Sequence, residues 1–273
     1  MNNNRRGVIY GHSQKTIEEF KQKYQREYIE LSADPNDDMT VYQSKFGGVP
    51  YLPDNFEYPF SRLYPDKPLM LLAQINFEEM PSLEDFPEKG ILQIYIAPED
   101  DRFFGCDDRI RHFEQKELEN QSEYRIIYHE NIDYSADNSD SIPKMNPCDF
   151  PVSEPAKISF EKKIGCIPYK YDDENFEEAF LEIYNQYSVA DETELENIFC
   201  AEDVFFEHVR HKIGGYQNDV WDAGWNNTDV LLLQIVRRDG IQIGDDGIAH
   251  FKITRDDLRS RNFSNVKYSW ECY

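Results

Sequence analysis

The sequence predicts an α+β protein made of two related halves that are rich in β-strands. Continuous apolar runs at 69–77 and 231–235 predict buried strands. Apolar residues at spacings of three and four, such as Ile17, Phe20 and Tyr24, predict helices that lay one face on a core. Three short patterns recur in the same order in the first and last thirds of the chain, which indicates an internal duplication.

The elements of the first half follow in order along the chain. A helix is predicted over Thr16–Leu31, because Tyr24 and Tyr28 continue the apolar stripe that starts at Ile17. Segment 44–53 is too rich in Gly and Pro for regular structure and is expected to form an ordered turn. Strands are predicted next, at 69–77, 91–96 and 124–128, with a connecting loop at 77–90.

The polar segment 100–155 holds the expected boundary between the halves. We therefore divide the chain into halves 1–155 and 156–273, packed as one globular unit. Two further helices are predicted in the second half, at 176–187 and at 192–210.

The repeated patterns carry the clearest message of the sequence. The matched pairs are 44–49 with 211–216 (SKFGGV and HKIGGY), 71–75 with 231–235 (LLAQI and LLLQI), and 89–96 with 246–253 (KGILQIYI and DGIAHFKI). The unequal spacings between the patterns fall where loops are expected, and loops absorb insertions at little cost.

Each copy of the pattern pairs a glycine turn with a buried glutamine. Gly47 and Gly48, matched by Gly214 and Gly215, would let the backbone adopt positive φ and pass close to a neighbouring strand. Gln74 and Gln234 lie inside apolar runs, where an unpaired amide would cost on the order of 1–3 kcal/mol. We expect them to bond to backbone, with contact to a ligand as the alternative.

The charge of the chain excludes some classes of partner. Its 53 acidic and 29 basic residues give a net charge of −24, which repels nucleic acids and anionic membranes and favours a cationic protein. With 18 Phe, 18 Tyr and 3 Trp the chain can bury a large core, so disorder is not expected.

Neither secretion nor a metal or other cofactor is predicted. The N-terminus MNNNRRGVIY has no apolar signal-peptide core, and five scattered cysteines fit neither a disulfide framework nor a zinc ribbon. We expect a cytoplasmic protein with reduced thiols. His208 and His211 have a spacing that could hold a metal, but favourable charge at a helix end is the preferred explanation.

No enzyme signature fixes a catalytic residue. The nucleophile elbow, the phosphate loop and the H-E-x-x-H motif are all absent from the sequence. The candidate binding residues are aromatic and acidic, because such side chains suit a hot spot for a basic partner. They are Tyr216, Trp221, Asp222 and Trp225, for which plain packing is the alternative. Asp245 and Asp246 are candidates of another kind: their Asp-Gly sequence favours a plain turn, and an oxygen-rich cation site or paired carboxylates for acid–base work are the alternatives.

These motifs resemble those of the YwqG-like family, bacterial proteins of unknown function. The resemblance rests on KFGGVPYLP at 45–53, LLAQINF at 71–77, HKIGGY at 211–216, LLQI at 232–235 and YSWEC at 268–272. It implies a mainly β fold of rolled or sandwiched antiparallel sheets with a few helices. It also implies that an immunity-type role beside a toxin is possible. Where relatives commonly carry Trp-Gly-Asp-x-Gly, this chain has Ile243 in place of the tryptophan.

Two functions follow as hypotheses. The first is a cytoplasmic acidic binding protein, plausibly an immunity-type inhibitor of a basic toxin. The second is an enzyme or small-ligand-binding protein with its site in a cleft between the two halves. Oligomeric state is not predicted.

Overall fold

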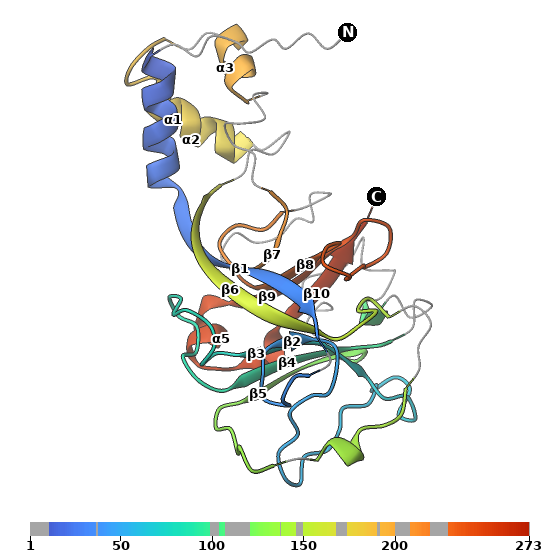
Figure 1. Cartoon of the computed structure of the whole chain (residues 1–273). Coiled ribbons are helices and arrows are strands. Elements are labelled where there is room, and N and C mark those ends of the chain that lie inside the picture. The colour runs from blue at the N-terminus through green and yellow to red at the C-terminus, as the bar shows by residue number, and fades with distance from the viewer. Residues whose placement is uncertain are drawn as a thin grey trace. The chain divides into compact units, whose positions relative to one another are not determined.

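The computed structural model describes ten β-strands and four α-helices (Figure 1). The described residues are 11–36, 38–98, 104–106, 121–136, 138–145, 150–167, 174–189, 192–199, 208–218 and 229–272. Helices α1, α2, α3 and α5 span Gly11–Lys23, Glu174–Tyr184, Glu192–Phe199 and Arg255–Arg259. Strands β1 to β10 span, in order, Gln25–Pro35, Lys45–Phe46, Met70–Asn76, Ile91–Ile96, Tyr124–His129, Ala156–Cys166, His211–Gly214, Asp229–Val236, Ile248–Thr254 and Lys267–Glu271. None of the described helices has the length and apolar character that a membrane crossing requires.

The chain forms two compact units. We call Met1–Glu27 with Ile164–Val209 the helical unit, and Tyr28–Lys163 with Arg210–Tyr273 the sheet unit. The predicted division at residue 155 concerns the repeated halves rather than these units, and it stays a prediction.

The helical unit has an aromatic core of its own. Phe20 of α1 packs on Phe176 of α2 with ring centroids 4.9 Å apart, and Phe180 packs edge-on against Phe199 of α3 at 5.1 Å. The apolar stripes in the sequence therefore do lie on a core, as their spacing predicts. Of the predicted helix at 192–210, the structure describes α3 as far as Phe199, while 200–207 lie outside the described residues. The predicted end at 210 is wrong, because 208–210 are not helical and His211 begins strand β7, so His211 does not lie at a helix end.

The predicted helix over Thr16–Leu31 is wrong in its second part. Helix α1 begins earlier, at Gly11, and ends at Lys23, after which β1 begins at Gln25. The reason is a change in the spacing of the buried residues, since Ile29, Leu31 and Ala33 alternate with exposed or half-buried neighbours. A period of two belongs to a strand, and pairing with another strand decides the outcome against the helical stripe.

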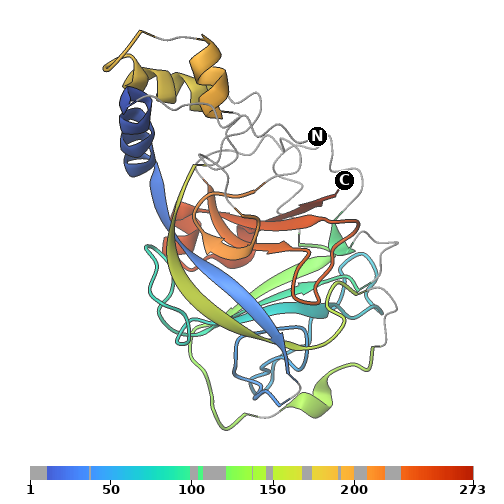
Figure 2. The same cartoon turned by 45° about the horizontal axis from the view of Figure 1, so that its top comes forward.

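The sheet unit is mainly β, as the sequence and the resemblance predict. One ten-stranded antiparallel sheet has the order β10-β9-β8-β7-β1-β6-β2-β3-β4-β5 and curls into a half-barrel. The predicted strands at 69–77, 91–96 and 124–128 are confirmed as β3, β4 and β5. Figures 1 and 2 show the blue β1 and the yellow-green β6 side by side at the middle of this order.

The two outer sets of strands share one pairing scheme. We call β2, β3, β4 and β5 the first arm, and β7, β8, β9 and β10 the second arm. In the first arm Lys45 stands opposite Gln74, and in the second arm Lys212 stands opposite Gln234. The register of the pair β3·β4 shifts between Leu71 and Ala73, and that of the pair β8·β9 shifts between Leu231 and Leu233.

The glycine pair of each short strand passes close to a central strand or to the residue that precedes it. Gly47, Gly48, Gly214 and Gly215 all have positive φ, between 62° and 73°. A Cβ atom on Gly48 would lie 3.2 Å from Cβ of Pro155, and one on Gly215 would lie 2.9 Å from Cβ of Tyr28. Only glycine combines this conformation with this approach.

The glutamines are fully buried and bond to backbone. Oε1 of Gln74 accepts from the N–H of Tyr51 at 2.9 Å, and its Nε2 donates to the carbonyls of Val41 and Gln43. The Gln74 oxygen also accepts from Nε2 of Gln93 at 2.9 Å, so its amide makes four hydrogen bonds.

The second arm repeats this arrangement with different side chains. Oε1 of Gln234 accepts from the N–H of Asn218 at 2.8 Å, and its Nε2 donates to the carbonyl of Arg210. His250 takes the place of Gln93, because its Nε2 lies 2.8 Å from the carbonyl oxygen of Asn218 as Nε2 of Gln93 lies 2.7 Å from that of Tyr51.

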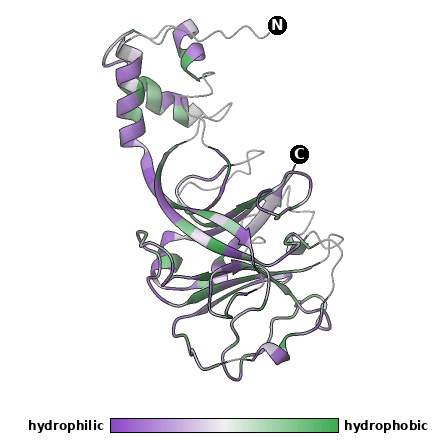
Figure 3. Ribbon diagram, viewed as in Figure 1, coloured by the Kyte–Doolittle hydropathy of each residue, from purple (hydrophilic) through white to green (hydrophobic). Residues whose placement is uncertain are grey.

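The two edge strands of the sheet meet through side chains. The hydroxyl of Tyr124 on β5 donates to the carbonyl of Val266 beside β10, and Nε2 of Gln121 donates to the carbonyls of Phe263 and Ser264. The main core lies on the inner side of the curl and draws apolar residues from both arms. Figure 3 shows hydrophobic and hydrophilic residues mixed along the two long central strands β1 and β6, whose burial patterns alternate.

Candidate functional site

An open concave surface lies where the β3–β4 connection approaches helix α5. It is an open depression of about 910 Å³. Its lining consists of Ser82–Lys89, Tyr128, Glu130, Lys162, Arg259 and Arg261. Residues from both sequence halves therefore line the same depression, all of them within the sheet unit.

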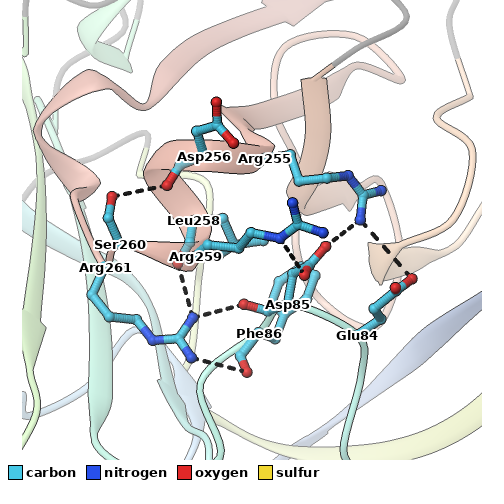
Figure 4. A network of polar contacts seen from close by, with 9 residues as sticks. All are labelled: Glu84, Asp85, Phe86, Arg255, Asp256, Leu258, Arg259, Ser260 and Arg261. Atoms are coloured by element: carbon cyan, nitrogen blue, oxygen red, sulfur yellow. Dashed lines mark hydrogen bonds and ion pairs between the residues drawn. The ribbon is translucent and has the colours of Figure 1, made fainter.

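Asp85 anchors the loop that forms one wall of the depression. It is the third residue of a turn in which the N–H of Phe86 donates to the carbonyl of Leu83, and its φ is 69°. Aspartate tolerates this left-handed conformation better than most residues. Its side chain, only 10% exposed, points toward α5 (Figure 4).

Two arginines of α5 hold this carboxylate. Nε of Arg259 donates to Oδ1 of Asp85 at 2.7 Å, and Nη1 of Arg255 pairs with Oδ2. Hydrogen bonding to Arg259 is the largest cause that lowers the pKa of Asp85, so the carboxylate is charged at neutral pH. Helix α5 itself is capped by Thr254, whose hydroxyl oxygen accepts from the N–H of Asp257.

Arg261 completes the contact through neutral oxygens. Its Nη1 donates to the carbonyls of Asp85 at 2.7 Å and Leu258 at 2.8 Å, and its Nη2 reaches the carbonyl of Phe86 at 3.4 Å (Figure 4). We call Asp85, Arg255, Arg259 and Arg261 the arginine clamp. It joins the β3–β4 connection of the first arm to the β9–β10 connection of the second.

The cations of the lining are engaged with oxygens of the protein. Nζ of Lys162 donates to the carbonyl of Ser82 at 3.0 Å, and Nζ of Lys89 lies 3.2 Å from Oδ1 of Asn131 and 3.4 Å from Glu130. The clamp accounts for Arg259 and Arg261. The lining holds four cations and four carboxylates, so its formal charge is zero.

The carboxylates at the rim are far less engaged. The Glu84 side chain is 81% exposed and approaches Arg255 no closer than 3.9 Å. Glu88 is exposed and makes no hydrogen bond or ion pair with the residues that the structure describes. Buried or half-buried apolar groups, among them Phe86 and Tyr128, lie beneath this rim.

Two histidines titrate abnormally but lie outside the lining. Burial lowers the pKa of His129 and of His211 from 6.5 to about 4. Nδ1 of His211 accepts from the N–H of Val236 at 3.2 Å, while its Nε2 has no hydrogen-bond partner in the described part of the chain. Ser44, which occupies the position of His211 in the first arm, makes the equivalent bond, because its hydroxyl oxygen accepts from the N–H of Asn76. The neutral ring of His211 therefore has a structural role.

The residues predicted for binding are not brought together at this depression. Trp221, Asp222 and Trp225 lie outside the described residues, and Tyr216 is half-buried after β7. Asp245 and Asp246 are exposed in the β8–β9 connection, where Asp246 has φ 53° and pairs with Arg237 at 2.7 Å. Their binding role stays a prediction.

Sequence reasoning missed the arginine clamp and the buried lysines. Arg255, Arg259 and Arg261 lie with two aspartates in the segment RDDLRSR, which shows no pattern beyond a solvated surface. Lys45 is fully buried, with Nζ donating to the carbonyls of Thr40 at 2.6 Å and Val49 at 2.9 Å, and burial lowers its pKa to about 8. The signal that could have revealed it is that a lysine stands before each glycine pair, Lys45 in the first pattern and Lys212 in the second.

The position of Ile243 resolves one consequence of the resemblance. Ile243 is fully buried in the main core of the sheet unit. A tryptophan at this position would be part of the core and would not stack on a ligand. Gly244, which follows it, lies against the ring of Trp270.

Fold and site together define a mainly β protein whose curled sheet carries an open depression of mixed charge. Residues 44–272 match the model of a protein family described as a domain of unknown function, DUF1963. Because the match spans most of the chain, the protein belongs to this family. No curated protein matches the chain.

Proposed function

We propose that the protein is a binding protein whose depression receives a cationic segment of a protein partner. The observation that carries this proposal is the unequal engagement of charges in the lining. Its four cations bond to the protein's own oxygens, whereas Glu84 and Glu88 stand at the rim with their carboxylates available. A lysine or arginine entering the depression would meet these carboxylates above an apolar floor.

The charge of the whole chain supports the same partner. A net charge of −24 attracts cationic proteins over long distances and accelerates their encounter. An immunity-type inhibitor that covers a basic toxin in the cytoplasm is the biological role that fits this chemistry. We also propose that the YwqG-like proteins, whose motifs resemble those of this chain, belong to the family described as DUF1963.

A lysine decapeptide provides a direct test of the charge preference. We expect it to bind with an affinity that falls as salt rises, because screening weakens attraction between exposed charges. The double variant Glu84→Gln/Glu88→Gln should bind about two- to thirtyfold more weakly, since two exposed pairs contribute roughly 0.2–1 kcal/mol each.

The matched control removes the same number of negative charges from positions that do not line the depression. Glu178→Gln/Glu196→Gln replaces two exposed glutamates of the helical unit. Equal affinities for the two double variants would place the binding elsewhere. Failure of a toxin from a neighbouring gene to co-purify at both low and high ionic strength would remove the immunity role.

A small ligand in the same depression is the second candidate function. It is favoured by Arg259, which uses only Nε in the clamp. Both of its Nη atoms are without a hydrogen bond or ion pair among the described residues. A guanidinium fork of this kind binds carboxylate or phosphate groups. Thermal-shift screening would detect such a ligand, because 100 times its dissociation constant adds about 2.7 kcal/mol of stability.

We also propose that the halves 1–155 and 156–273 arose by duplication. Three features support this proposal: the strand order is the same read from either end toward the middle, the register shifts in both arms fall at matching positions, and the glutamine bonds recur. A structural comparison that cannot superpose the two arms with Gln74 on Gln234 would oppose it.

A further inference from the structure

The central strands are exchanged between the two sequence halves. Strand β1 belongs to the first half, yet it pairs with β7 of the second, with Tyr28 opposite Gly214 and Leu31 opposite His211. Strand β6 belongs to the second half, yet it pairs with β2 of the first, with Lys45 opposite Lys157. Neither arm is extended by the long strand of its own half.

The two exchanged contacts are equivalent in detail. Gly215 approaches Tyr28 in β1 across the boundary between the halves, and Gly48 approaches Pro155, the last residue before β6. Ile158 on β6 and Leu31 on β1 occupy matching positions beside the short strands, and both are buried in the main core. The N–H of Ile158 donates to the carbonyl of Ser44 at 3.1 Å.

From this geometry we propose that the halves are mutual binding partners, each completed by a strand that the other supplies. The binding surface of the first half is the open edge of β2, and the matching surface of the second half is the edge of β7. The occupant of each edge is an eleven-residue strand, β6 or β1. The chain is thus a strand-exchanged pair of modules joined by one covalent connection.

The arrangement also makes the depression depend on both modules. Ser82–Lys89, Tyr128 and Glu130 come from the first half, and Lys162, Arg259 and Arg261 come from the second. A ligand site at this place exists only after the halves have interlocked. The inference itself rests on strand register and is independent of what binds in the depression.

The connection between the halves can be cut in the folded protein. We would insert a protease site after Lys144, which is exposed, and cleave the full-length chain under native conditions. The pieces should stay together on a sizing column, and the unfolding midpoint should now rise with protein concentration, as that of the intact chain does not. Separation of the pieces without denaturant would overturn the proposal.

Refolding of the pieces distinguishes strand exchange from simple contact between independent domains. After separation in denaturant, neither piece alone should regain a cooperative unfolding transition, and mixing them should restore it. A piece that refolds by itself as a monomer with native near-ultraviolet circular dichroism would refute the exchange.

A matched pair of substitutions locates the binding energy on β6. In the cleaved protein, Ile158→Asp at a buried position should weaken association of the pieces at least a hundredfold. Ile164→Asp on the same strand, where the side chain is 64% exposed, should change it less than threefold. Equal effects of the two substitutions would show that β6 does not hold the halves together.

Discussion

Replacing Gln74 with leucine is expected to lower the free energy of unfolding by about 3 kcal/mol. The substitution keeps the size of the side chain but removes all four hydrogen bonds of the amide. Two of the abandoned donors are buried: the N–H of Tyr51 and one N–H of Gln93 Nε2, whose other N–H keeps its bond to the carbonyl of Tyr51. Each unsatisfied donor costs roughly 1–3 kcal/mol.

Two smaller effects set the net value. The carbonyls of Val41 and Gln43 belong to half-buried residues and can recover part of their bonding from water. Burial of the more apolar leucine returns about 1 kcal/mol. A loss of about 2–6 kcal/mol from the two buried donors is therefore reduced to a net loss near 3 kcal/mol.

Urea unfolding followed by circular dichroism measures this change. Gln234→Leu in the second arm should cost a similar amount, while Gln14→Leu on the exposed face of α1 should stay within about 0.5 kcal/mol. Unchanged stability of Gln74→Leu would refute the structural role and return the glutamine to the list of ligand contacts.

Three further predictions address the glycine turn of the second arm, the arginine clamp and His211. Gly215→Ala should lower the free energy of unfolding by about 1–3 kcal/mol, because a φ of 69° is strained for alanine and the new Cβ meets Tyr28. Gly11→Ala is the control: its Cβ meets nothing, so the same urea titration should show no loss. Asp85→Asn should lower the melting temperature at low salt by more than Asp246→Asn does. Because the pKa of Asp85 is lowered in the folded state, its contribution to stability is present above its ordinary pKa and disappears as pH falls through the folded value. His211 has a lowered pKa of about 4, so the unfolded state binds its proton first and stability falls by up to about 3 kcal/mol as pH drops from 6.5 to about 4. His211→Ser, which copies Ser44 of the first arm, should remove that part of the pH dependence; an unchanged slope in unfolding experiments at stepped pH would contradict the assignment.

Strands β3, β4 and β5 could be predicted because each is a short apolar run flanked by turn residues. Helix α1 was placed too late and extended too far, since Tyr28 continues a helical stripe that strand pairing overrides. Strand β6 was missed although Ala156, Ile158 and Phe160 alternate with polar residues, because its many charges resemble a loop.

The candidate site could not be predicted in the same way. The acid of the clamp, Asp85, and its arginines are separated by about 170 positions in the chain, and neither segment carries a local pattern. Only the meeting of the β3–β4 and β9–β10 connections brings them together. Rim glutamates such as Glu88 are likewise indistinguishable in the sequence from any other solvated acid.

By itself the sequence determined the local features of this protein: its acidic charge, the glycine turns, the buried glutamines and the strands around them. These features depend on neighbours in the chain, through backbone freedom at glycine and through the cost of burying an unpaired amide. The tertiary structure decided which half supplies each central strand and which charges line the depression. Both depend on long-range pairing, whose energy lies in contacts between residues that no local pattern relates.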